Sequence, residues 1–251
     1  MTEQTLKELL YKFADDQLIL GHRNSEWTGM GPLLEEDIAF SSMAQDKVGH
    51  SLAFYNLLHE LGEQEPDIVA FTRNANQFHN SQFVELPIGD YSFSLIRHFL
   101  FDHAELVRFT MLADCAIEEI AFVAKKLRGE VKYHVMHANT WIKQLGKANA
   151  ESNTKMQAAL DYALPFALGM FETSANENDI INANIYKGEA AVELKWKQNI
   201  AIVLKEANLI LPAWNTISPV YGGRQGEHTE HLQPLLDEMT EVFKEDPTAD
   251  W

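Results

Sequence analysis

Cysteine is almost absent from this chain: Cys115 is the only one in 251 residues, so no disulfide can form within it. A single thiol suits a reducing compartment, and we expect a cytoplasmic protein. Apolar runs are short, because polar residues interrupt them before the roughly 18 positions that a membrane span needs. The opening MTEQTLKELLYKFADD is acidic and amphipathic, so we expect neither a signal peptide nor a membrane partner.

Basic residues are also scarce. Lysine and arginine number 20 against 37 aspartates and glutamates, which gives a formal net charge of −17. Because phosphate binding needs a basic surface, this balance argues against nucleic acid as a general partner. It leaves open a protein partner, particularly one with a basic face.

No segment alternates between apolar and polar residues with the period of two that strands show, so the sequence predicts an all-α protein. The length suits one domain with a sizeable core, which we expect to span residues 1–251. Residues 62–90 form a long connection, typical of a packed crossover or a functional loop. Helical spacing predicts helices over 3–22, 32–61, 91–113, 116–147, 153–172 (bent or broken at Pro165), 189–207 and 230–244.

Two helices carry pairs of residues three apart, at the spacing by which Glu-x-x-His motifs hold iron in carboxylate four-helix bundles. The first pair lies in AQDKVGHSLAFYNLLHELG and the second in GEVKYH. A polar residue lies 30 positions before the first pair and another lies 29 before the second, which fits a duplicated helical hairpin. The six positions that would surround the metals are Gln17, Lys47, His50, Asp102, Val131 and His134. Three of the four carboxylates are missing.

Spacing alone leaves two interpretations open. A histidine on an inner helix face is more often a hydrogen-bonded core residue than a ligand. Alternatively, His50, Asp102 and His134 could form a facial triad for a single non-haem iron, making the chain a metal-binding oxygenase in its own right. The cationic Lys47 beside them counts against that alternative.

Several further segments resemble the PaaC family, the C subunits of bacterial phenylacetyl-CoA epoxidases. They are SEWTG, FTRNANQFHN, GEVKYH and the most specific of them, YGGRQGEHTEHLQPLLDEM. The resemblance runs from about residue 12 to Trp251. AQDKVGH is similar in turn to the metal helix of the catalytic A subunit, where QDEAGH supplies a glutamate and a histidine.

The resemblance implies a ferritin-like four-helix bundle, with its core over about 3–148 and additional C-terminal helices over about 150–251. It implies a structural, non-catalytic subunit of a complex that converts phenylacetyl-CoA to its ring-1,2-epoxide. This chain would hold no cofactor. Iron would belong to the catalytic A subunit, whereas NADPH, flavin and iron–sulfur groups would belong to the reductase subunit. The partners implied are the A subunit and further epoxidase subunits, with self-association as an open question.

Lys47 can explain how such a site survives without metal. A buried Asp102 without a cation would cost several kcal/mol or would have to take up a proton. We therefore expect the Lys47 ammonium to replace the metal, paired with Asp102 and directed toward His50 or Gln17. The alternative is that Lys47 extends from the helix edge into solvent.

The segment YGGRQGEHTEH, residues 221–231, carries the remaining candidate residues. It is glycine-rich, but no strand precedes it, so it is not a phosphate-binding P-loop. We expect a subunit-contact loop or a contact to CoA phosphates, with Arg224, His228 and His231 as interface candidates. Glu227, His228, Glu230 and His231 look metal-like, but the favoured interpretation has Thr229 or Glu227 capping the final helix.

Overall fold

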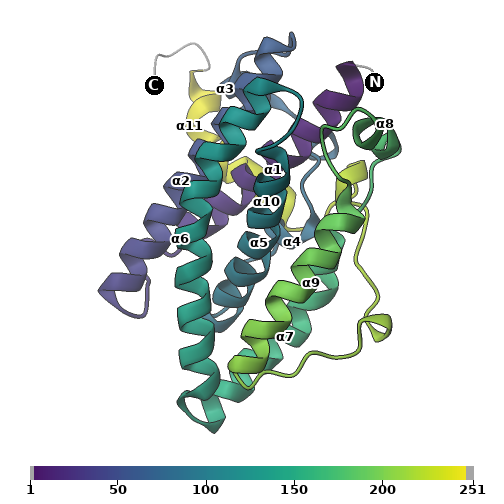
Figure 1. The fold of residues 1–251 in the computed structure, drawn as a ribbon. Helices are drawn as coiled ribbons and strands as arrows, with labels where there is room; N and C mark the ends of the chain where they lie inside the picture. Colours follow the sequence, from purple (N-terminus) through teal and green to yellow (C-terminus); the bar gives the residue numbers. More distant parts are fainter. Residues whose placement is uncertain (1–2, 247–251) are drawn as a thin grey trace.

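The computed structural model describes residues 3–246 and contains no strand within that range, as the all-α prediction requires. Two long helical hairpins form a ferritin-like bundle (Figure 1). The first consists of α1 (Glu3–Ser25) and α2 (Leu34–Glu60), the second of α5 (Tyr91–Leu112) and α6 (Glu118–Ala148). Each predicted long helix of the bundle is therefore present, with ends shifted by a few residues.

The hairpin of α1 and α2 packs closely because a glycine lies at the contact. A Cβ on Gly21 would meet Val48 Cγ2 at 3.0 Å and the Ala44 carbonyl oxygen at 3.3 Å. The absence of a side chain lets the two backbones approach. After α2 ends, Gly62 takes a φ of +87°, which glycine adopts without steric cost.

The connection between the hairpins is packed rather than loose. It contains the short helices α3 (Pro66–Thr72), η1 (Ala75–Gln77) and α4 (Gln82–Glu85). Arg73 fastens it to α1 through hydrogen bonds of 2.6 and 3.0 Å to the Asp15 carboxylate, whose Oδ1 also accepts from Tyr55 at 2.6 Å. These contacts make the segment a packed crossover, one of the two alternatives that its length predicted.

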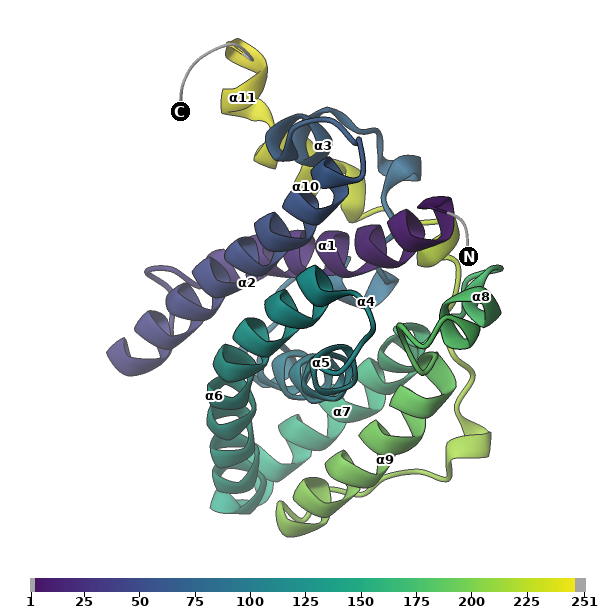
Figure 2. The same cartoon turned by 45° about the horizontal axis from the view of Figure 1, so that its top comes forward.

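The C-terminal helices cover the second hairpin. Figure 2 shows α7 (Ala150–Gly169) and α9 (Glu189–Glu206) against α5 and α6, on the side away from α1 and α2. One prediction of helix continuity was wrong: the helix predicted over 230–244 is two, α10 (Leu232–Met239) and α11 (Glu241–Glu245), separated at Thr240. Of the two alternatives predicted at Pro165, bent or broken, the break is absent, because α7 continues through this residue. The short helices α8 (Glu177–Asn182), η2 (Trp214–Thr216) and η3 (Gly223–Gln225) were not predicted.

One hydrophobic cluster joins these layers. It takes buried side chains from α1, α2, α5, α6, α7, α9 and α10, so the C-terminal helices share the core of the bundle. In the described part of the chain, no helix is both long and apolar enough to cross a lipid bilayer. Polar side chains lie inside the cluster near the middle of α1, α2 and α5, and the candidate site is there.

Candidate functional site

A buried ion pair occupies the centre of the bundle. Lys47 on α2 donates a hydrogen bond from Nζ to Asp102 Oδ1 on α5 at 2.5 Å, and both side chains are 0% exposed. The ammonium also lies 4.8 Å from the centroid of the Phe101 ring. The predicted pairing of Lys47 with Asp102 is therefore present, and the alternative in which Lys47 reaches solvent is wrong.

Two histidines complete the surroundings of the Asp102 carboxylate. His98, one turn earlier on α5, places Nδ1 against Oδ2, and His134 on α6 places Nδ1 3.7 Å from Oδ1. Burial alone would raise the pKa of Asp102, but the Lys47 charge and then the contact with His98 hold that pKa well below its usual value. Asp102 is thus an ionised carboxylate whose oxygens face a lysine and two imidazoles.

The two histidines predicted as ligands each hydrogen-bond through Nε2 to an acidic residue. Nε2 of His50 hydrogen-bonds to Glu130 at 2.7 Å, and Nε2 of His134 hydrogen-bonds to Asp46 at 2.9 Å. Burial and the nearby Lys47 charge lower the pKa of His50 to about 3. Burial also opposes protonation of His134, but the nearby Asp102 carboxylate and the hydrogen bond to Asp46 outweigh it and raise its pKa.

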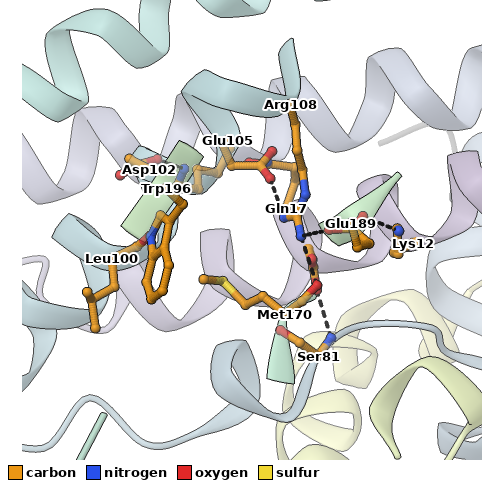
Figure 3. A network of polar contacts seen from close by, with 12 residues as sticks. Lys12, Gln17, Ser81, Leu100, Asp102, Glu105, Arg108, Met170, Glu189 and Trp196 are labelled. Carbon is orange, nitrogen blue, oxygen red and sulfur yellow. Dashed lines mark hydrogen bonds and ion pairs between the residues drawn. The ribbon is translucent and has the colours of Figure 1, made fainter. Parts of the chain in front are cut away.

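Gln17 belongs to a second polar chain rather than to the Lys47 pair. Its Nε2 donates to Glu105 Oε2 at 2.5 Å, and Glu105 accepts from Arg108 at 2.9 Å. Arg108 also donates to Glu189 at 2.8 Å, and Lys12 binds the other oxygen of Glu189. Figure 3 shows these side chains in a row between α1, α5 and α9. We also expected Lys47 to be directed toward His50 or Gln17, but it forms no hydrogen bond with either residue.

Val131 has no polar contact and is fully buried in the hydrophobic cluster. It lies on α6 three residues before His134, the spacing of a Glu-x-x-His motif. Within residues 3–246, no three His, Cys, Asp or Glu side chains are arranged to hold a metal ion. A di-iron centre of this type takes four carboxylates and two imidazoles, so the donor set present here does not fit one.

Comparison with known proteins identifies the family of this chain. The model of the family described as phenylacetic acid catabolic protein matches residues 1–251. The chain belongs to this family. It is also similar to the C subunit of 1,2-phenylacetyl-CoA epoxidase from Escherichia coli (strain K12), at 30% identity over 244 residues and 96% of each chain. The role of this chain therefore lies in phenylacetate catabolism.

In this member of the family, the 221–231 loop is tied to the inside of the chain. Arg224 binds the Asp16 carboxylate with both terminal nitrogens, at 2.8 and 2.7 Å, and its side chain is 3% exposed. His228 hydrogen-bonds to the Phe78 carbonyl oxygen at 3.1 Å. Both residues, predicted as interface candidates, therefore have partners within the fold, while the His231 side chain stays 36% exposed.

The metal-like appearance of EHTEH does not correspond to a cluster of donors. Glu230 is 84% exposed, and His228 points inward toward Glu85. The predicted cap was wrong as well: His231 takes the N-cap position of α10 and no side chain caps it. Thr229 Oγ1 instead accepts a 3.3 Å hydrogen bond from the His231 backbone nitrogen.

The sequence reasoning missed the polar residues that surround the predicted positions. His98 and Glu105 lie four residues before and three after Asp102, on neighbouring turns of one helix face. That spacing is a signal that a search along the helix could have found. Arg108 and Glu189 are 81 residues apart, and no local pattern links them.

Proposed function

We propose that this chain is a structural, non-catalytic subunit of a multicomponent phenylacetyl-CoA epoxidase and that it supports a di-iron catalytic subunit. Iron would reside in that partner, while a reductase subunit would supply electrons from NADPH. The family and the relationship to an epoxidase C subunit support a role in this pathway. The proposal that this chain is non-catalytic rests on the residues of its own buried site.

The observation that carries the proposal is the Lys47–Asp102 pair. The Lys47 ammonium lies three residues before His50, where a Glu-x-x-His motif would carry its glutamate, and it pairs with the Asp102 carboxylate. Hard iron sites require anionic oxygen ligands, whereas Lys47 adds positive charge and Val131 offers hydrocarbon only. The lysine thereby replaces the charge of the metal and keeps the bundle core electrically balanced without it.

Iron content gives the first test. We expect the chain purified alone from iron-rich medium to hold far less than one iron per protomer. Copurified with a catalytic subunit, it should leave the iron with that partner when the chains are separated and assayed. Stoichiometric iron on this chain, lost when His50, Asp102 or His134 is replaced, would favour the oxygenase alternative.

Turnover by mixed subunits gives the second test. A scaffold contributes no titrating group to the reaction, so Lys47→Met/Asp102→Asn should support phenylacetyl-CoA turnover like the natural chain once assembly is equal. Gel filtration of the same mixtures measures assembly, and Lys155→Met serves as a surface control. If the core variant assembles normally but abolishes turnover, the chain contributes chemistry and the proposal fails.

A further inference from the structure

Arg97, on α5, is the one buried cation within residues 3–246 that forms no ion pair. The residue is 0% exposed, and no carboxylate of the described chain contacts its guanidinium. Burying a charge without a partner is costly, so buried lysines and arginines are normally paired. The other five buried in this range follow that rule, and each binds an aspartate or a glutamate: Lys12, Arg23, Lys47, Arg108 and Arg224.

Most of the hydrogen-bond donors of Arg97 also lack a partner. Nη1 donates to the Leu86 carbonyl oxygen at 2.5 Å, whereas Nε and Nη2 have no acceptor in the described chain. The guanidinium carbon lies 5.3 Å from the centroid of the Phe93 ring. A carbonyl oxygen and a ring face offer only partial negative charge, and a guanidinium accepts no hydrogen bond. The two nitrogens therefore need an acceptor, and the full charge needs an anion.

The charges around Arg97 leave an excess of positive charge. Burial and repulsion by Arg23 lower the pKa of Arg97 to about 9, although Glu26 attracts it, so the guanidinium is still charged at neutral pH. Glu26 is bound by Arg23 at 2.6 Å, so two arginines share one carboxylate. The buried carboxylate of Glu85 lies 3.3 Å from His228 and forms no ion pair with either arginine.

Asn24, on α1, supplies a second donor without a partner at the same level of the bundle. Two hydrogen bonds set the register of α1 and the turn after it against α5: Gln17 to Glu105 and Trp27 to Ser94. Residue numbers rise on α1 as they fall on α5, which places Asn24 level with Arg97. Asn24 is 1% exposed, and its Nδ2 has no acceptor among the described residues. Arg23, beside Asn24, and Arg97 donate to the carbonyl oxygens of adjacent residues, 85 and 86, so both donors lie in one part of the interior.

We propose that Arg97 and Asn24 bind a chloride ion inside the bundle, between α1 and α5. The unpartnered groups of both side chains are N–H donors, and a set of donors without an acceptor matches an anion. An excess of one positive charge favours a monovalent ion over phosphate or sulfate. A water molecule would satisfy the hydrogen bonds but would leave the charge uncompensated.

Chloride would then stabilise the folded chain specifically. The two donors come together only when α1 packs on α5, so the unfolded chain has no such site. Above its dissociation constant, each tenfold rise in chloride should raise the folding equilibrium constant about tenfold. Urea unfolding in sodium chloride and in sodium gluconate at equal ionic strength measures the effect, because both salts screen surface charges alike. We expect the natural chain to unfold at a higher urea concentration in chloride.

Replacing Arg97 tests the cationic side of the site. Arg97→Met keeps a long unbranched side chain but removes the charge, so its unfolding midpoint should be the same in chloride and in gluconate. Arg128→Met is the matched control, because Arg128 is a half-buried arginine on α6 and has no ion pair within the described chain. This control should keep the full chloride dependence.

Replacing Asn24 tests the charge balance, and it decides the question even if the Arg97 variant does not fold. Asn24→Asp has nearly the shape of the natural side chain but brings its own negative charge to the level of Arg97. This variant should be more stable than the natural chain in gluconate, and it should no longer respond to chloride. If chloride stabilises it as much as it stabilises the natural chain, the assignment of the site is wrong.

Bromide can locate the ion directly. Crystals of the full chain grown in sodium bromide should show an anomalous peak within hydrogen-bond distance of Arg97 Nη2 and Asn24 Nδ2, and crystals of Arg97→Met should lack it. Bromide at surface side chains alone, an adventitious ion only, overturns the proposal. Equal unfolding midpoints of the natural chain in chloride and gluconate, or an Arg97→Met chain that keeps the chloride dependence, also overturn it. The iron and turnover assays do not involve this site, so the proposed function stands or fails separately.

Discussion

Replacing Lys47 by methionine should destabilise the protein strongly. Methionine keeps a long unbranched side chain but removes the ammonium from a pair in which both side chains are 0% exposed. Asp102 would keep only the imidazoles of His98 and His134 as partners. Breaking a buried pair from one side typically costs about 3–5 kcal/mol, because the remaining charge is left uncompensated. For a chain of this length, that loss corresponds to a melting temperature lower by roughly 6–10 °C.

The pH dependence of this loss follows from His134. Its pKa is raised in the folded protein, so its protonated form becomes available as the pH falls and can supply the missing positive charge beside Asp102. We therefore expect Lys47→Met to cost less at pH 6 than at pH 8. Urea unfolding followed by far-ultraviolet circular dichroism at both pH values measures the difference.

A double-mutant cycle separates the pair from simple packing effects. Asp102→Asn removes the charge that Lys47→Met leaves unpaired, so the double variant should recover part of the lost free energy of unfolding. Lys155→Met, which breaks an exposed ion pair with Glu151, should change stability little. If Lys47→Met is close to neutral, or if the double variant is no more stable than the single one, the ion pair does not balance the core.

Two further predictions concern the same interior. Burial lowers the pKa of His98 to about 4 and that of His50 to about 3. As the pH falls below about 6.5, these two histidines therefore become protonated in the unfolded chain but stay neutral in the folded chain. Stability should therefore be highest above pH 6.5 and fall toward pH 4, and His98→Gln should flatten this slope in urea titrations; an unchanged slope would contradict the assignment. Arg224→Lys should lose about 1.5–3 kcal/mol, because lysine cannot bind both Asp16 oxygens as a fork; a neutral effect in thermal melts would show that the contact is dispensable.

Local pattern was enough to predict the long helices, whereas their arrangement as a ferritin-like bundle was implied by the family resemblance. The period of 3.6 marks which face of each long helix is buried, and the pairing of Lys47 with Asp102 follows from electrostatics once both lie on inner faces. The separation of α10 from α11 was not predictable in this way. The Thr240 hydroxyl donates a hydrogen bond of 2.7 Å to the Leu236 carbonyl oxygen. Hydrophobic spacing does not reveal whether a single residue such as this one continues a helix or forms a turn.

The contacts of the individual site residues depended on distant segments. Gln17 was expected near Lys47, but it binds Glu105, whose carboxylate is held in place by Arg108. Arg224 was predicted as an interface candidate, whereas it binds Asp16 on the first helix of the same chain. Separations of 88 and 208 residues leave no trace in local periodicity, so only the assembled fold reveals such pairs.

The Arg224–Asp16 contact also bears on the order in which the protein matures during synthesis. Asp16 leaves the ribosome well before its counterion, which is 208 positions behind it. At translation rates of roughly 5–20 residues per second, the first helix waits about 10–40 s before that arginine exists. A chain interrupted before residue 224 would hold a buried, uncompensated carboxylate and should stay open to proteases. Closure of the core around Asp16 thus depends on the synthesis of residue 224.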